Sequence, residues 1–145
     1  MSEHRLEDLE QIRTLKALYA ERVDANHRAP SDATAVAAAA LFTDDAILDL
    51  GPFGRYEGHA QILNAFANIF PAATAWSAHY IVNPVLHVTG ATATGRWYFL
   101  LVTQPKTTPA SPALTVYGSY AEKYEKTKDG WKFKEVIGSL TAPTT

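Results

Sequence analysis

The chain has 145 residues, of which 47% are hydrophobic and 19% charged, and its formal net charge is -2. This length suits one domain with one substantial core, so we expect residues 1–145 to form a single domain. The small net charge gives no general attraction to nucleic acid or anionic lipid, so the expected partner is a hydrophobic small molecule. Cysteine is absent, which excludes disulfide scaffolds, thiolate nucleophiles and cysteine-ligated zinc.

The first six residues are polar and lack the apolar core of a secretory signal. The apolar segments along the chain fall short of the roughly 20 residues that a membrane-spanning helix needs. We therefore expect a cytoplasmic protein that makes no membrane contact.

Apolar residues recur every three or four positions over residues 6–26, with charged residues between them, which predicts an amphipathic helix. Pro30 interrupts this pattern, and the serine or aspartate after it can cap a second helix over the alanine-rich residues 33–42. Asp44 and Asp45 follow this run and are interpreted as a helix end or turn.

A short strand is predicted over residues 46–50, followed by a glycine- and proline-rich turn and a return segment over 55–58. A third helix is predicted over residues 60–70, and Pro71 is expected to end it. From residue 75 onward the pattern is typical of long strands. These strands are expected at residues 76–88, 93–104, 114–126 and 131–140.

Helices followed by a run of long antiparallel strands indicate α+β architecture, with the helices packed on one face of a curved sheet. A doubly wound α/β fold would need helices between the late strands, and those connections are too short. The strand over residues 93–104 is apolar on both faces. We expect one face to pack under helices and the other to form a homodimer through the sheet.

His79 is the strongest candidate for chemistry, because a histidine in an apolar strand can act as a general base when a carboxylate orients its ring. No aspartate or glutamate occurs between Glu57 and Glu122, so the carboxylate must come from elsewhere in the chain. Asp24 on the first helix is the main candidate, and Asp49 is its rival.

Strand alternation places Asn83 on the same face as His79. If that face is the concave one, both side chains lie in a pocket; if it is the outer face, they are solvated or at a dimer interface. A set of aromatic residues either lines the pocket or forms an ordinary core. The candidate substrate-binding residues are Asn83, Phe53, Tyr56, Phe66, Trp97 and Phe99.

The sequence predicts neither a metal site nor a cofactor. The five histidines show no compact metal-ligand spacing, and the glycines form no dinucleotide-binding or phosphate-binding motif. The chain also lacks the GxSxG motif of serine hydrolases.

The order of motifs resembles the SnoaL-like group within the nuclear transport factor 2-like fold, a cone of helices and curved sheet that encloses one pocket. The resemblance covers nearly the whole chain. It is carried by residues 18–24, 41–46, 58–62, 79–83, 120–124 and 129–133.

In members that resemble bile-acid dehydratases and lindane dehydrochlorinases, a histidine on this strand removes a proton and an aspartate on the first helix orients it. The resemblance implies these roles for His79 and Asp24, and it implies that Tyr19 is the tyrosine of the dehydratase type. Those relatives also use an arginine on a late strand, but no arginine follows Arg96 here. The residues that could replace it are Lys132, Lys134, Glu122 and Glu135.

The resulting hypothesis is a cofactor-independent lyase or isomerase in which His79 removes a proton from a hydrophobic cyclic molecule. Asp24 would orient His79, and Tyr19, with Asn83, would hydrogen-bond the departing or developing oxygen. The alternative is a non-catalytic small-molecule-binding or interaction domain, in which Asp24 and His79 form a structural hydrogen bond. The sequence leaves elimination and isomerisation both open.

Overall fold

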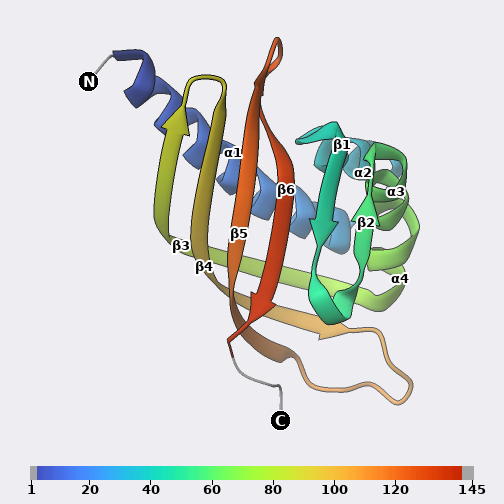
Figure 1. Ribbon diagram of the computed structural model, residues 1–145. Coiled ribbons are helices and arrows are strands. Elements are labelled where there is room, and N and C mark those ends of the chain that lie inside the picture. The colour runs from blue at the N-terminus through green and yellow to red at the C-terminus, as the bar shows by residue number, and fades with distance from the viewer. Residues whose placement is uncertain (1–2, 142–145) are drawn as a thin grey trace.

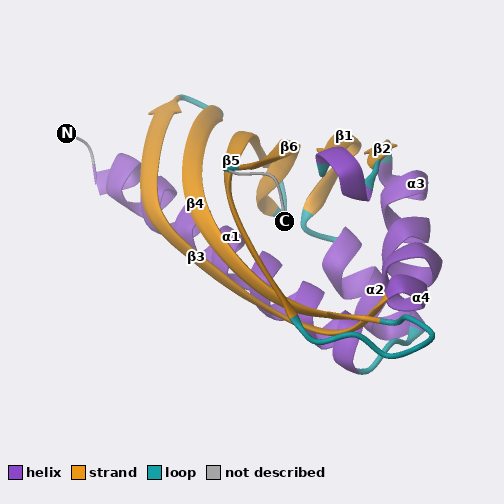
Figure 2. Cartoon of the chain, turned by 90° about the horizontal axis from the view of Figure 1, so that it is seen from below, coloured by secondary structure: helices purple, strands orange, loops and turns teal. Residues whose placement is uncertain are grey.

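The computed structural model describes residues 3–141, in which helices and a curved six-stranded sheet form a mixed α+β fold (Figures 1 and 2). Along these residues, none of the helices is both long and apolar enough to cross a membrane. A 3₁₀ turn at Gly51–Phe53 and a π-helical segment at Ala65–Ile69 join the regular elements. These are α1 (Glu3–Arg28), α2 (Asp32–Ala39), β1 (Phe42–Asp49), β2 (Arg55–Glu57), α3 (His59–Asn64), α4 (Phe70–Ala73), β3 (Thr74–Thr89), β4 (Thr92–Pro105), β5 (Leu114–Thr127) and β6 (Gly130–Leu140).

The strands run in the order β2-β1-β6-β5-β4-β3, and every neighbouring pair is antiparallel except β1 with β6. The long strands β3, β4 and β5 curve around α1, which lies along the concave face (Figure 2). The predicted α+β class and curved sheet are therefore confirmed. The sheet stays unclosed, because its end strands β2 and β3 do not pair with each other.

The structure corrects the predicted boundaries around the second helix. That helix ends at Ala39, and Phe42 begins β1 and pairs with Phe133 in the buried core. Asp44 and Asp45 are therefore exposed strand residues, and the prediction that they form a helix end or turn is wrong. The wrong prediction came from the helical propensity of the alanine run, which the core packing of Phe42 overrides.

Pro71 also does not end a helix. It lies in the first turn of α4, directly after the π-helical segment. A proline is tolerated in the first turn because the amide N–H that it lacks would have no partner within the helix there.

The core contains a buried ion pair between α1 and β5. Lys16 Nζ lies 2.5 Å from Glu122 Oε2, and the two side chains are 1% and 0% exposed. The other carboxylate oxygen accepts a hydrogen bond of 2.7 Å from the Tyr124 hydroxyl. The ammonium also lies 3.6 Å from the ring centroid of Tyr120 and 4.0 Å from that of Tyr19. Burial lowers the pKa of Lys16, and the charge of Glu122 opposes that shift.

We expect Lys16→Met to lower the free energy of unfolding by roughly 3–5 kcal/mol, because it leaves the Glu122 carboxylate buried without its cation. Urea denaturation measures this change. The control is Lys134→Met, which removes a half-exposed ion pair with Asp45 and should change the free energy by less than about 1 kcal/mol. Equal losses in the two variants would contradict this account.

Candidate active site

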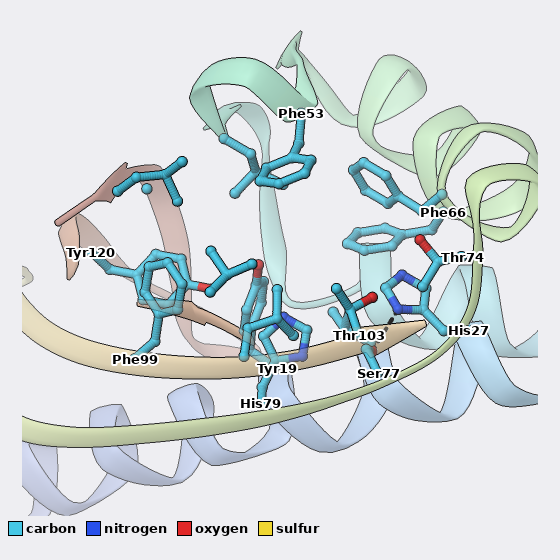
Figure 3. A pocket seen from close by; sticks show the side chains of 17 residues that line it. Tyr19, His27, Phe53, Phe66, Thr74, Ser77, His79, Phe99, Thr103 and Tyr120 are labelled. Atoms are coloured by element: carbon cyan, nitrogen blue, oxygen red, sulfur yellow. Dashed lines mark hydrogen bonds between the residues drawn. The ribbon is translucent and has the colours of Figure 1, made fainter. Parts of the chain in front are cut away.

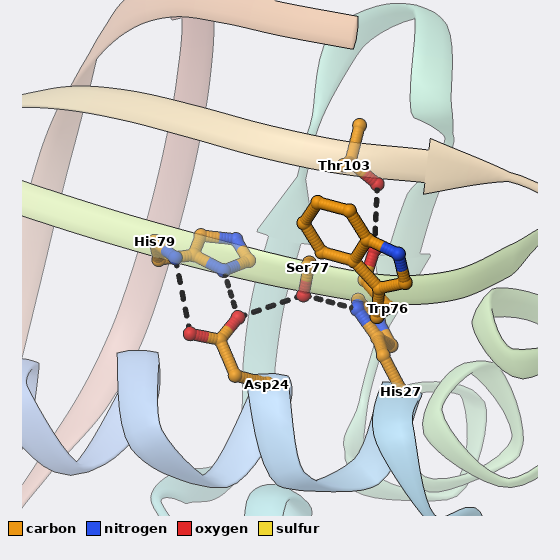
Figure 4. A network of polar contacts seen from close by, with 6 residues as sticks. All are labelled: Asp24, His27, Trp76, Ser77, His79 and Thr103. Carbon is orange, nitrogen blue, oxygen red and sulfur yellow. Dashed lines mark hydrogen bonds and ion pairs between the residues drawn. The ribbon is translucent and has the colours of Figure 1, made fainter. Parts of the chain in front are cut away.

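The candidate site forms where the last turns of α1 lie beside the start of β3. His79 Nδ1 is 2.6 Å from Asp24 Oδ1, and the backbone N–H of His79 donates to Asp24 Oδ2 at 3.0 Å (Figure 4). Two contacts to one carboxylate fix both the strand backbone and the imidazole ring. Because a carboxylate only accepts hydrogen bonds, Nδ1 carries the proton. The other ring nitrogen, Nε2, points away from Asp24 (Figure 4).

Ser77 adds a third hydrogen bond to the same carboxylate. It precedes His79 by two residues on β3, so both side chains leave the strand on one face. The Ser77 hydroxyl donates to Asp24 Oδ1 at 2.7 Å. Burial alone would raise the pKa of Asp24, but the hydrogen bonds from His79 and Ser77 and the electrostatic interaction with His79 outweigh it, so the pKa is lowered. Asp24 is therefore ionised at neutral pH.

His27 extends this polar network along α1. Its Nδ1 lies 2.6 Å from the Ser77 hydroxyl oxygen, whereas its Nε2 is buried and has no hydrogen-bond partner among the described residues. Burial lowers the pKa of His27 to about 4, so the ring is neutral near pH 7. Sequence analysis missed both His27 and Ser77. Their spacing was the available signal, since His27 follows Asp24 by one helical turn and Ser77 shares the face of His79.

A cavity of about 110 Å³ opens next to this network (Figure 3). Its wall is mostly apolar, with the polar groups gathered at the α1–β3 side. The aromatic lining residues are Tyr19, Phe53, Phe66, Phe70, Phe99 and Tyr120. The polar lining residues are His27, Thr74, Ser77, His79 and Thr103.

Tyr19 lies beside His79 in the cavity wall, and Tyr120 packs against Tyr19. Both are almost fully buried, their rings meet edge to face with centroids 5.9 Å apart, and the Tyr19 ring lies 6.1 Å from that of His79. Burial raises the pKa of both hydroxyls well above the ordinary value for tyrosine. Both hydroxyls are therefore protonated at neutral pH, and a side-chain hydrogen bond joins them.

Phe66 lies in the π-helical segment and lines the cavity. The side-chain amide of Asn26, fully buried on α1, donates to the Phe66 carbonyl oxygen at 2.7 Å. An oxygen released from the regular helical pattern thus finds a partner on α1. This bond ties the wall of the cavity to the helix that carries Asp24.

Three of the predicted substrate-binding residues line the cavity, namely Phe53, Phe66 and Phe99. Two others do not. The indole N–H of Trp97 donates to the Tyr124 hydroxyl at 2.9 Å, within the buried Lys16–Glu122 cluster. The Tyr56 hydroxyl donates to the Phe53 carbonyl oxygen, and its ring packs against Phe70.

Asn83 is exposed and lies outside the cavity. It has a positive φ of 59°, and the register between β3 and β4 shifts between Val82 and Val85. A β-bulge of this kind interrupts the alternation of side chains between the two faces of a strand. The prediction that Asn83 shares the pocket face of His79 is therefore wrong.

The remaining candidates are placed elsewhere. Asp49 accepts a hydrogen bond from the Gly51 backbone and pairs with Arg55, so Asp24 and not Asp49 is the carboxylate bonded to His79. None of the four residues considered as replacements for the late-strand arginine lines the cavity. These are Lys132, Lys134, Glu122 and Glu135.

The sequence matches the family model of the SnoaL-like domain over residues 4–137. Among solved structures, a "putative aromatic ring hydroxylase" from Novosphingobium aromaticivorans is 31% identical, with a TM-score of 0.81 over 97% of this chain and 93% of that one. A "putative scytalone dehydratase" from the same organism is 21% identical, with a TM-score of 0.84 over 99% and 91% of the chains.

The hexachlorocyclohexane dehydrochlorinase LinA-type3 from Novosphingobium barchaimii is also 21% identical, with a TM-score of 0.80 over 97% of this chain and 90% of that one. Proteins of the NTF2-like superfamily share the fold as well. Among curated proteins, none matches the sequence. The family match covers nearly all of the described residues, and the chain therefore belongs to the SnoaL-like domain family.

Proposed function

We propose that this protein is a cofactor-independent lyase or isomerase that removes a proton from carbon in a small, hydrophobic, cyclic molecule. One observation carries the proposal. His79 is held by the ionised Asp24 carboxylate through its Nδ1, while the ring borders a mostly apolar cavity. An imidazole that a carboxylate orients through one nitrogen, at the wall of an apolar cavity, has the arrangement of a general base.

In the proposed step, His79 Nε2 accepts the proton and becomes part of an imidazolium. In an elimination, the C–H bonding electrons form a carbon–carbon double bond and the leaving group departs with its own bonding pair. In an isomerisation, the C–H bonding electrons form the carbon–carbon double bond of an enolate while the carbonyl π electrons move onto its oxygen. The imidazolium then returns the proton to a different carbon as the carbonyl re-forms. Asp24 stabilises the imidazolium in both cases, because its negative charge lies 2.6 Å from Nδ1.

Tyr19 and Tyr120 supply the second half of the proposed chemistry. Oxygen gains negative charge in either reaction, and a buried donor that is already oriented stabilises that charge. Both hydroxyls stay protonated because burial raises their pKa. The Lys16 ammonium makes cation–π contacts with the electron-rich faces of both rings, and these contacts hold the two side chains in place.

The size of the cavity suits a substrate that contains a single ring. Its volume of about 110 Å³ is somewhat below the roughly 150 Å³ of an engineered cavity that binds benzene. Phe53 lines the cavity and is 51% exposed, so it lies at the opening, where a larger substrate extends outward. The names of two relatives, which mention an aromatic ring and hexachlorocyclohexane, also concern ring compounds.

The alternative is a binding domain without catalysis. It is favoured by the fact that Asp24, Ser77 and His27 also form a continuous network that ties α1 to β3. In that case His79 would contribute to stability and ligand binding but not to turnover. Measuring the activity of a folded His79 variant separates the two proposals.

We expect His79→Ala to lower kcat by roughly 10²- to 10⁴-fold, because it removes the general base. Exchange of carbon-bound hydrogen for deuterium in D₂O, followed by NMR over a panel of cyclic ketones and alcohols, detects proton removal from whichever panel member is a substrate. The matched control is His87→Ala, an exposed histidine on the same strand, which should leave the rate unchanged. Near-normal exchange by a folded His79→Ala protein would favour the binding domain.

We also propose that the protein is a homodimer through the outer face of the sheet. Tyr80, Tyr98 and Tyr117 lie on neighbouring strands of this face and are 59%, 62% and 57% exposed. Large aromatic side chains gathered on one face are typical of a protein–protein interface. Pairing of two identical faces satisfies the symmetry of a closed dimer.

We expect Tyr98→Lys to convert the dimer into a monomer, because it places a charge at the centre of this face. Sedimentation velocity measures the change. Lys123→Ala, a substitution of an exposed side chain further along β5, serves as the control. A wild-type protein that sediments as a monomer would refute the proposed dimer.

A further inference from the structure

The hydrogen bonds around Ser77 determine the proton position on His27. The Ser77 hydroxyl has one proton, and it is donated to the Asp24 carboxylate at 2.7 Å, since that group can only accept. Ser77 must therefore act as the acceptor in its second contact, 2.6 Å from His27 Nδ1. His27 thus carries its proton on Nδ1. Its Nε2 is left as a lone-pair acceptor.

This acceptor is buried and unpaired. His27 is 8% exposed, and Nε2 has no hydrogen-bond partner among the described residues. The pKa of His27, lowered to about 4 by burial, keeps Nε2 unprotonated near pH 7. An acceptor that has lost water without gaining a donor destabilises the protein. A ligand that brings a donor to this atom recovers that lost free energy.

The position of His27 makes such a ligand accessible. Its ring lines the same cavity as His79, close to Thr74 and Thr103 (Figure 3). The adjoining cavity wall includes Phe70, whose ring meets the imidazole edge to face with centroids 6.2 Å apart. A ligand reaches Nε2 from the cavity by moving part of this wall, as side chains commonly do on binding.

We propose that His27 Nε2 is a second recognition point in the cavity, which accepts a hydrogen bond from a neutral hydroxyl group on the substrate. The inference rests on the proposed function, because it takes the cavity as the substrate site. It narrows the substrate class to ring compounds that carry a phenolic or alcoholic O–H in addition to the carbon that loses its proton. A cationic donor is disfavoured, since the surrounding wall is mostly aromatic and aliphatic and would remove its water of solvation.

Two substitutions separate the two nitrogen atoms of His27. His27→Asn places an amide near the position of Nδ1, so it can still donate to Ser77 but has no acceptor near Nε2. His27→Gln places its amide near Nε2, so it keeps an acceptor in the cavity but loses the donor to Ser77. A role in ligand recognition and a role in supporting Ser77 therefore predict opposite results for this pair.

The probes are phenol and toluene, which are nearly the same shape and differ in the hydroxyl. NMR titration of the wild-type protein and each variant gives the ratio of the two dissociation constants, toluene over phenol. Comparing this ratio between proteins cancels the difference in hydration of the two probes. We expect the ratio to fall roughly tenfold in His27→Asn, the loss of one hydrogen bond, and to fall much less in His27→Gln. An unchanged ratio in His27→Asn overturns the proposal.

Two further measurements complete the test. In wild-type protein labelled with ¹⁵N, the His27 Nε2 resonance should move on addition of phenol and stay in place on addition of toluene. This measurement does not depend on the folding of a variant. No movement with bound phenol overturns the proposal. In His79→Ala the phenol preference should persist; its loss there would place the hydroxyl at His79 instead. Because these are binding measurements, they remain informative even if His79→Ala retains activity and the proposed function fails.

Discussion

The arrangement of the site depends on the carboxylate of Asp24. This group receives hydrogen bonds from the His79 ring, the His79 backbone and the Ser77 hydroxyl. Three donors outweigh the desolvation of a partly buried charge, and so the carboxylate stays ionised. The same three bonds position β3 against α1 and set the tautomer of His79. The hydrogen bonds that join α1 to β3 are therefore the same ones that orient the proposed base.

The charge of Asp24 determines where the protons lie on both His79 and His27. An ionised carboxylate can only accept, so His79 is protonated on Nδ1 and Ser77 is committed as a donor. Ser77 in turn requires His27 to be protonated on Nδ1. The partly buried charge of Asp24 thus places the Nδ1 proton on both histidines. On His27 this leaves Nε2 as a hydrogen-bond acceptor in the cavity wall.

A second buried charge pair holds the tyrosine wall. The Lys16 ammonium lies over the rings of Tyr19 and Tyr120 and pairs with Glu122. The Tyr124 hydroxyl donates to Glu122 and accepts from the Trp97 indole. Such a cluster contributes little net stability compared with an apolar core, but it tolerates few alternative arrangements. In this protein the cluster fixes the positions of the Tyr19 and Tyr120 rings. The Trp97 side chain belongs to this support rather than to the cavity surface.

The sequence by itself predicted the α+β class, the long strands and the family resemblance, because hydrophobic periodicity and turn residues are local signals. It also pointed to Asp24 as the partner of His79, since no carboxylate occurs between Glu57 and Glu122. Both inferences rest on residue type and spacing. These properties do not depend on how the elements pack.

The tertiary structure decided the rest of the site. The bulge at Asn83 removes that residue from the pocket face, because one extra residue in a strand reverses the alternation that sequence reasoning assumes. The Lys16–Glu122 pair joins residues 106 positions apart, and the His27–Ser77 contact joins residues 50 positions apart. Which polar side chains meet, and which of their atoms remain unpaired, depends on how the helix docks on the sheet, because burial and hydrogen-bond partners are set by elements that are distant in the chain.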